Sequence, residues 1–325
     1  MSELSMRDAI NEALAEELER DEQSYLIGED IGKPGGSFAV TRGLYDEFGE
    51  QRVIDTPISE AAIVGSSAGA ALTGSRPIAE IMYADFMGLA TDQLLNQAGL
   101  FKYMFGGETT VPMTVRTVNG GAGFNAAAQH SKSLHGLFMH MAGIRVVVGS
   151  TTYDTKGLLK SAIRCDDPVV FFEHMGLYNK SAEIPDEPYT LPLGEAAIEQ
   201  EGEDVTIIAT QKMLHEALDV ADSLDGEISV EVISPRTLKP LDRDTLAESA
   251  RKTGRVVVAD ESLIQNGPAS YIAKCVEEDA FYHLEAPVEV LGIDDTPVPF
   301  SPALAGEVVP DGEDIESAIR SMPHL

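Results

Sequence analysis

The sequence predicts an α/β protein of two domains, each with a mostly parallel sheet flanked by helices. Short apolar runs typical of buried strands alternate along the chain with longer segments of helical apolar spacing. At 325 residues, the chain is long enough for two ordinary domains. Residues 181–203 are rich in proline and acidic residues and lack periodicity. We therefore expect a first domain at 1–180, a linker at 181–203 and a second domain at 204–325.

The first domain is expected to begin with an amphipathic helix over residues 4–20, where apolar residues recur at near-helical spacing among acidic ones. The small-residue run at 59–72 predicts a helix whose glycines permit close packing. Further helices are expected at 88–103 and 153–164. Short apolar runs predict strands at 25–28, 77–82, 113–118, 144–148 and 168–173.

The second domain repeats this alternation on a smaller scale. Helical spacing predicts helices at 214–224 and 269–278. The expected strands are 205–210, 228–233, 256–260 and 288–291. Its sequence contains no P-loop or metal-binding motif.

Composition excludes several classes of function. The net charge of −31, with 23 Lys and Arg against 54 Asp and Glu, would repel nucleic-acid phosphates and anionic membranes. No apolar run approaches the roughly 20 residues that span a bilayer, and residues 1–21 are too charged for a signal peptide. We expect a cytoplasmic protein in which Cys165 and Cys275 are reduced thiols. Acidic residues spread along the whole chain also indicate a halophilic origin.

Glu60 is the candidate catalytic acid. Its neighbours include Ile58 and Ile63, and removing a carboxyl group from water raises its pKa toward the range useful for proton transfer. The alternative is structural, because Pro57 and Ser59 are typical of a helix N-terminus, where negative charge is favoured. Taken alone, these residues favour the structural interpretation.

Ser67 is a second candidate, because residues 65–69 match the G-x-S-x-G pattern of a hydrolase nucleophile elbow. An elbow needs a strand before the serine and a helix after it. Here the serine falls inside the helix expected at 59–72, which argues against a serine hydrolase.

His130 is a third candidate. It follows a glycine-rich loop at 119–125, which allows backbone to approach a ligand but lacks the Walker lysine. A histidine there can act as an acid, a base or a hydrogen-bond donor near neutral pH, although a lone histidine is more often structural. His130, His135 and His140 lie five residues apart, a spacing that a helix turns to different faces, so a three-histidine metal site is not expected.

Four segments resemble a known family. They are 52–60 (RVIDTPISE), 128–131 (AQHS), 156–164 (KGLLKSAIR) and 168–173 (PVVFFE). They are similar to the β subunit of thiamine-diphosphate-dependent 2-oxo acid dehydrogenases, the E1 component, and the resemblance runs from about residue 4 to the end. It implies a transketolase-like pyrimidine-binding domain followed by a transketolase C-terminal domain. The implied reaction is oxidative decarboxylation of pyruvate or a related 2-oxo acid with acyl transfer to a lipoyl group, and branched-chain 2-oxo acid and acetoin dehydrogenases are the alternatives.

The resemblance also implies roles for individual residues. Glu60 matches the glutamate that hydrogen-bonds the aminopyrimidine ring of the cofactor and drives its imino tautomer, which reverses the structural interpretation. His130 matches the histidine that stabilises the reaction intermediate or passes it to the lipoyl group. Phe86 matches an aromatic residue that packs on the pyrimidine, and Ile58 and Met82 match apolar residues of that pocket. The positions matching a structural potassium site, held largely by main-chain oxygens, are Val111, Met113, Thr114, Ala162, Cys165 and Asp167.

The absence of one motif indicates that the chain needs a partner. The chain has no Gly-Asp-Gly followed by paired asparagines, the usual grip on magnesium and diphosphate. The resemblance therefore implies an E1 α partner that holds Mg²⁺ and the diphosphate, with active sites between the subunits of an α2β2 heterotetramer. It also implies docking of the second domain to the dihydrolipoyl acyltransferase, E2. A non-catalytic assembly subunit is the remaining alternative.

Overall fold

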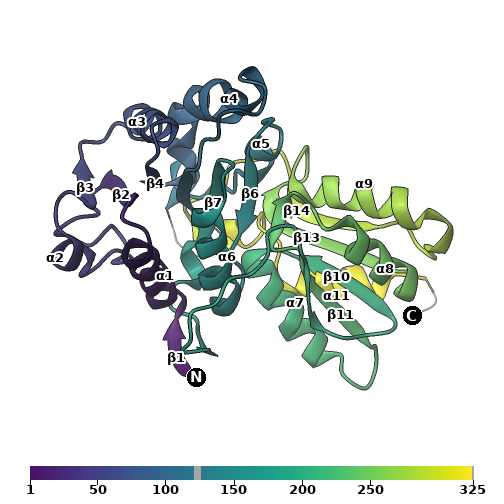
Figure 1. The fold of residues 1–325 in the computed structure, drawn as a ribbon. Coiled ribbons are helices and arrows are strands. Elements are labelled where there is room, and N and C mark those ends of the chain that lie inside the picture. Colours follow the sequence, from purple (N-terminus) through teal and green to yellow (C-terminus); the bar gives the residue numbers. More distant parts are fainter. Residues whose placement is uncertain (121–125, 324–325) are drawn as a thin grey trace. The chain divides into compact units, whose positions relative to one another are not determined.

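The computed structural model describes residues 1–120 and 126–323, and its chain forms two compact units (Figure 1). The first unit contains Met1–Asn119 and Phe138–Leu193, and the second contains Gly120–Leu137 and Gly194–Leu325. Residues 120–137 therefore belong to the second unit, although their sequence neighbours on both sides belong to the first. Each unit combines a mostly parallel sheet with helices, which confirms the predicted fold class.

The first unit contains a parallel sheet with the strand order β6-β7-β5-β4-β2-β3. These strands are β2 (Ser24–Glu29), β3 (Val53–Thr56), β4 (Arg76–Ile81), β5 (Thr114–Asn119), β6 (Arg145–Val148) and β7 (Val169–His174). Every residue of β5 and β7 is buried, as expected for central parallel strands covered on both faces. A separate antiparallel pair joins β1 (Ser2–Ser5) to β8 (Ser181–Ile184).

Helices surround this sheet. They are α1 (Met6–Arg20), α2 (Leu44–Phe48), α3 (Glu60–Leu72), α4 (Gly99–Met104) and α6 (Thr152–Arg164), with α5 (His135–Met139) where the chain re-enters the unit and the short turn η4 (Met175–Leu177) after β7. The helix expected over 4–20 begins at Met6, because Leu4 pairs with Ala182 in the β1–β8 ladder. The hydroxyl of Ser5 accepts a hydrogen bond from the Asp8 N–H and caps the first turn.

The helix expected over 88–103 is present, but its type changes along its length. The 3-10 segment η1 (Ala84–Ala90) is followed by two α-helical residues, the π segment η2 (Gln93–Ala98) and then α4. Where η1 ends, the Thr91 hydroxyl donates to the Gly88 carbonyl oxygen at 2.9 Å, and such side-chain bonds compete with regular helical ones.

The second unit contains a sheet with the strand order β14-β13-β10-β11-β9, in which only β9 runs antiparallel to its neighbour. Its strands are β9 (Ala197–Gln200), β10 (Val205–Ala209), β11 (Val230–Ser234), β13 (Val256–Leu263) and β14 (Glu289–Ile293). The short strand β12 (Thr237–Lys239) is not part of this sheet. Its helices are α7 (Gln211–Ser223), α8 (Arg243–Thr253), α9 (Pro268–Ala280), α10 (Pro302–Ala305) and α11 (Gly312–Ser321), with the short turns η3 (Ala127–Gln129) and η5 (Phe281–His283). Leu214 of α7 and Ile315 of α11 share its apolar core.

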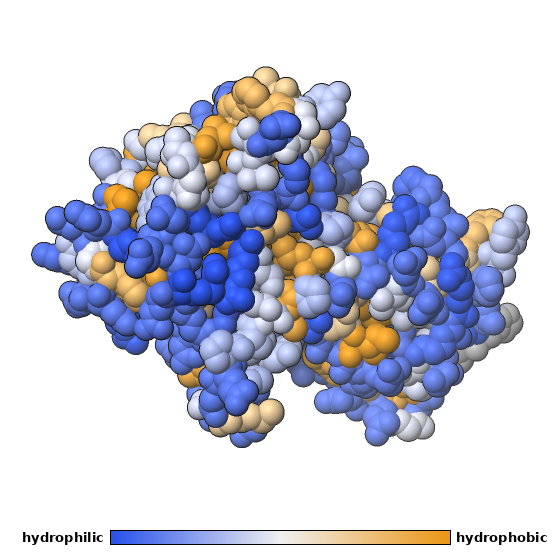
Figure 2. All heavy atoms as spheres, viewed as in Figure 1, coloured by the Kyte–Doolittle hydropathy of each residue, from blue (hydrophilic) through white to orange (hydrophobic). Residues whose placement is uncertain are grey.

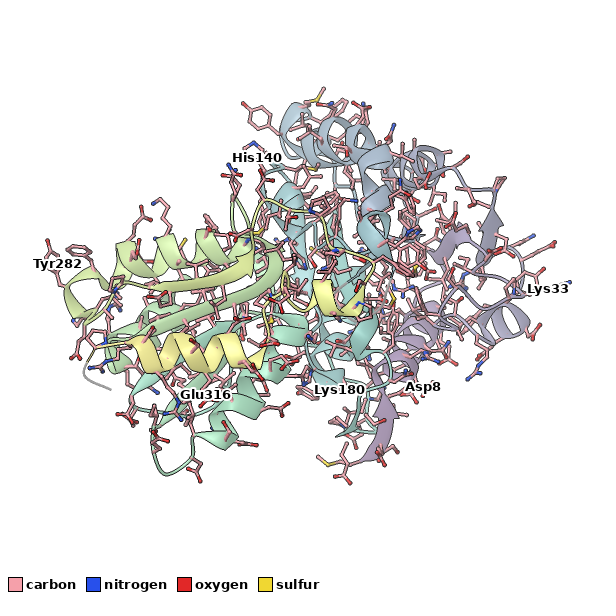
Figure 3. The ribbon with its side chains drawn as sticks, turned by 180° about the vertical axis from the view of Figure 1, so that it is seen from behind. Asp8, Lys33, His140, Lys180, Tyr282 and Glu316 are labelled. Atoms are coloured by element: carbon pink, nitrogen blue, oxygen red, sulfur yellow. The ribbon has the colours of Figure 1, made fainter. Side chains whose placement is uncertain are left out.

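Polar and charged residues dominate the visible faces of both units (Figure 2). The labelled side chains of Lys33, Glu316 and Tyr282 project outward (Figure 3), and Tyr282 is 94% exposed. In the part of the chain that the structure describes, no helix is both long and apolar enough to cross a membrane.

Helices α1 and α6 are joined by ion pairs. The ammonium group of Lys156 lies 2.7 Å from Glu12 and 3.0 Å from Glu16, and Lys160 also pairs with Glu16. Both lysine side chains are buried. Burial alone would lower the pKa of Lys156, but the two glutamates outweigh it and raise that pKa. Lys156 therefore stays charged within the helix interface.

A buried ion cluster links three neighbouring strands of the first sheet. Arg116 on β5 donates to Glu173 on β7 at 2.6 Å and to Glu80 on β4 at 2.7 Å. The Tyr178 hydroxyl also donates to Glu173, at 2.7 Å. Burial alone would lower the pKa of Arg116, but the two carboxylates raise it. The guanidinium group is therefore the fixed positive charge that these carboxylates need.

Replacing this charge should unfold the first unit readily. We expect Arg116→Met to lower the free energy of unfolding by about 3–5 kcal/mol, because two buried carboxylates lose their partner. Urea denaturation measures this loss. The triple variant Arg116→Met, Glu80→Gln, Glu173→Gln is the control and should recover much of it. A single variant as stable as the wild type would contradict a structural role for the cluster.

Candidate functional site

Glu60 lies at the carboxyl edge of the first sheet. Strand β3 ends at Thr56, and a short turn leads to Glu60, the first residue of α3, with Ser59 at the N-cap position. The side chain is only 8% exposed. The predicted helix start and the predicted poor solvation of this carboxyl group are both confirmed. Strand β3, which leads to Glu60 at this edge, was not among the strands predicted from the sequence.

Two of the three predicted pocket residues lie at the same edge. Met82 directly follows β4 and is 5% exposed, and Phe86 is half-buried in η1, which packs against α3. The carboxyl ends of parallel strands meet at one edge of a sheet, which is where α/β proteins bind ligands. Ile58, by contrast, is 76% exposed. A branched apolar side chain beside a buried carboxyl group is thus left facing solvent.

Glu29 is a functional candidate that the sequence analysis missed. It ends β2 and is the register partner of Thr56 at the end of β3. Burial raises the pKa of Glu29, and the negative charges of Glu60 and Asp30 raise it further. A carboxyl group whose environment holds a proton near the candidate acid is typical of proton-transfer sites. Its position at the end of a predicted strand could have indicated this role, but only with knowledge that β2 and β3 are parallel neighbours.

His130 lies in the second unit. It follows η3, its side chain is half-buried, and its N–H donates to the Ala127 carbonyl oxygen at 3.3 Å. A Cβ atom at Gly120 would overlap the His130 carbonyl oxygen, so only glycine permits this close approach. The remainder of the predicted glycine-rich loop, 121–125, lies outside the described residues.

Ser67 is not placed as a nucleophile. It lies within α3, its side chain is fully buried, and its hydroxyl donates to the Ile63 carbonyl oxygen at 2.7 Å. A nucleophile elbow would expose the serine at a strand-to-helix turn. The hydrolase alternative is therefore wrong, because Ser67 serves helix packing.

The residues predicted to hold potassium lie around the end of α6 and the starts of β5 and β7. The Arg76 guanidinium donates to the Cys165 carbonyl oxygen at 2.8 Å. Lys102 and Arg145 bind the Asp167 carboxylate at 2.6 and 2.8 Å. Burial would raise the pKa of Asp167, but these two cations outweigh it and lower that pKa. Two groups at this position thus already have cationic partners: the Cys165 carbonyl oxygen is bound by Arg76, and the Asp167 carboxylate by Lys102 and Arg145.

Clusters of His, Cys, Asp and Glu that could hold a metal ion are absent from residues 1–120 and 126–323.

Two protein families match the chain. The family described as "Transketolase, pyrimidine binding domain" matches residues 2–180, and "Transketolase, C-terminal domain" matches residues 194–315. Among solved structures, "Split gene transketolase, inactive beta4 tetramer" superposes with a TM-score of 0.78 at 25% identity, covering 98% of this chain and 97% of that one. The same two-domain arrangement thus spans nearly the whole chain.

Three relatives from Bacillus subtilis (strain 168) match almost end to end. Acetoin:2,6-dichlorophenolindophenol oxidoreductase subunit beta is 47% identical over 97% of this chain and 95% of its own. Pyruvate dehydrogenase E1 component subunit beta is 45% identical over 93% and 94%. 2-Oxoisovalerate dehydrogenase subunit beta is 40% identical over 99% of both chains. The three identities are close, so overall similarity does not separate the substrates.

The raised pKa of Glu29 has a measurable consequence. The folded protein holds this proton above the ordinary pKa of 4.5, so Glu29 makes stability fall as pH rises through the interval between 4.5 and its folded pKa. We expect Glu29→Gln to remove this loss, so that its melting temperature gains on the wild type as pH rises above 4.5. The exposed Glu22→Gln is the control. If melting temperature changed with pH in the same way in the wild type and in Glu29→Gln, the raised pKa of Glu29 would be refuted.

Proposed function

Because the chain belongs to the β subunits of the E1 components of 2-oxo acid dehydrogenases, we propose that it catalyses oxidative decarboxylation of pyruvate or a related 2-oxo acid. The acyl group is transferred to a lipoyl-bearing partner. The observation that carries this proposal is the match of 40–47% identity over at least 93% of the chain to β subunits of this family. The family's domains also imply dependence on thiamine diphosphate.

Acetoin and branched-chain 2-oxo acids are the alternative substrates. The acetoin relative has 47% identity and the pyruvate relative 45%, against 40% for the 2-oxoisovalerate relative. Residues 128–130 (AQH) resemble the pyruvate and acetoin versions more than the branched-chain ones. On this ground we place pyruvate and acetoin together ahead of branched-chain 2-oxo acids.

The edge that carries Glu60 suits the pyrimidine half of the cofactor. When bound, thiamine diphosphate would supply a nucleophilic thiazolium carbon and a charged ring that takes up the electron pair released by decarboxylation. The role of Glu60 is to hydrogen-bond the pyrimidine ring and exchange a proton with it, and its burial excludes bulk water from the carboxyl oxygens. Met82 and Phe86 supply an apolar wall, and His130 donates a hydrogen bond or proton during acyl transfer.

The second half of the site comes from a partner chain. Our proposed partner is an α subunit that binds Mg²⁺ and the diphosphate, because this chain lacks the Gly-Asp-Gly and paired-asparagine motif. The 76% exposure of Ile58 supports a shared pocket, since an apolar side chain beside a buried carboxyl group gains from being covered. The assembly would be an α2β2 heterotetramer that docks to the dihydrolipoyl acyltransferase.

Location and salt dependence are also proposals. Both cysteines are free thiols, which supports a reducing, cytoplasmic compartment. The charge of −31 supports adaptation to high salt. A structural potassium ion at Val111, Met113, Thr114, Ala162, Cys165 and Asp167 would have to share its oxygens with Arg76, Lys102 and Arg145.

Purification with any bound partner, followed by assay on a 2-oxo acid panel, tests the function. We expect a stoichiometric α subunit and decarboxylation that requires thiamine diphosphate. Glu60→Gln in that assembly should lower turnover by about 10²–10⁴-fold, the usual contribution of a general acid or base. Ser67→Ala is the matched control from the same helix and should keep wild-type turnover. Full activity in Glu60→Gln would overturn the catalytic assignment.

Melting temperatures in KCl and NaCl at equal ionic strength separate the two salt proposals. A general response of the acidic surface raises stability equally in both salts, because screening depends on ionic strength. A potassium site adds an increment in KCl alone, since binding to the folded state stabilises it. The same temperature in dilute buffer and molar salt would exclude adaptation to high salt. Identical curves in the two salts would exclude the potassium site.

A further inference from the structure

A buried side-chain cluster in the second unit lies outside the proposed catalytic groups. Its members are His135, Gln211 and Asp260, each no more than 2% exposed. Gln211 is the first residue of α7, and Asp260 lies in β13. His135 comes from the inserted segment 120–137 that also carries His130. The cluster therefore joins that segment to two elements of the C-terminal unit.

Both ring nitrogens of His135 face acceptors on the C-terminal unit. Nε2 lies 3.2 Å from the Gln211 side-chain oxygen, and Nδ1 lies 3.8 Å from the nearer Asp260 carboxylate oxygen. The first distance is a hydrogen bond and the second is a close electrostatic contact. A buried imidazole between an amide oxygen and a carboxylate is held in one orientation.

Asp260 is itself held rigidly. The Ser262 N–H donates to its carboxylate at 2.9 Å, and the hydroxyls of Ser262 and Thr210 also donate to it. Thr210 directly follows β10, the parallel neighbour of β13. A buried carboxylate of this kind is costly unless it is paired and hydrogen-bonded. His135 is a further polar neighbour of this carboxylate, and it comes from the inserted segment.

A second contact lies next to this cluster. A Cβ atom at Gly136 would be 2.7 Å from the Asn266 carbonyl oxygen, so glycine is required for this approach. Asn266 has a φ of 59°, a left-handed conformation that asparagine tolerates better than most residues. The segment thus meets the C-terminal unit through a side chain at 135 and through backbone at 136.

We propose that His135, Gln211 and Asp260 are positioning residues that hold the segment carrying His130 on the carboxyl edge of the second sheet. His130 lies five residues before His135, and Gly120 closes against the His130 backbone. These three residues thereby act on acyl transfer without touching substrate. This inference rests on the proposed function, because it takes the role of His130 from there.

Amide hydrogen exchange of the purified assembly tests the anchor without an activity assay. We expect Asp260→Asn and His135→Leu to accelerate exchange of peptides within 126–137 by about tenfold, since a buried hydrogen-bonded contact is lost. Val257→Ala, in the core of the same strand, is the matched control and should leave these peptides unchanged. Should His135→Leu fail to fold, Gln211→Ala replaces it. Unchanged exchange in every anchor variant would overturn the proposal.

A double-mutant cycle with His130→Ala tests the link to function. We expect Asp260→Asn to lower kcat for acyl transfer by up to about 10²-fold, as small misplacements of reacting groups do. In a His130→Ala background, Asp260→Asn should leave kcat almost unchanged. Cofactor affinity should stay at the wild-type value in all variants. If the losses of kcat caused by Asp260→Asn and by His130→Ala multiplied in the double variant, the positioning role alone would be overturned. Weaker cofactor binding in Asp260→Asn would overturn it as well. Wild-type turnover in His130→Ala would instead overturn the assigned role of His130, and the positioning proposal with it.

Discussion

The charge of Arg116 is the constraint on which the first unit depends. Three neighbouring strands contribute charged groups to one buried site, and the guanidinium group of the middle strand satisfies carboxylates on both sides. A sheet shifted by one residue would move these side chains to opposite faces. The ion cluster therefore fixes the register of β4, β5 and β7. Because Met82 directly follows β4, that register also determines the position of Met82 at the sheet edge where Glu60 lies.

Local signals in the sequence were enough to predict the start of α3. Pro57, Ser59 and the small-residue run that follows are a helix N-terminus in any context, and Glu60 falls at its first position. The poor solvation of Glu60 was predictable for the same reason, because its apolar neighbours are adjacent in sequence. The assignment to proton chemistry came from resemblance to a family, since the isolated residues favoured a structural role.

Features made by distant residues were not predictable. Arg116 lies 36 residues from Glu80 and 57 from Glu173, and sequence patterns do not give the lateral order of strands. Glu29 and Thr56 are register partners because β2 and β3 are neighbours, which the sequence pattern does not predict. His135 was considered only as a metal ligand and rejected on helical spacing, whereas its partners come from α7 and β13. Such contacts depend on topology, which a single sequence does not encode locally.

The crossing of the chain between units has a consequence for synthesis. Neither unit is a continuous stretch of sequence, because residues 120–137 belong with the C-terminal half and β6 and β7 follow them. On the ribosome, His135 emerges well before Gln211 and Asp260, so the inserted segment waits undocked while the first sheet acquires its last strands. Closing such long loops slows folding. A gene cut between codons 193 and 194 would yield a C-terminal fragment whose Asp260 has lost His135 from the start.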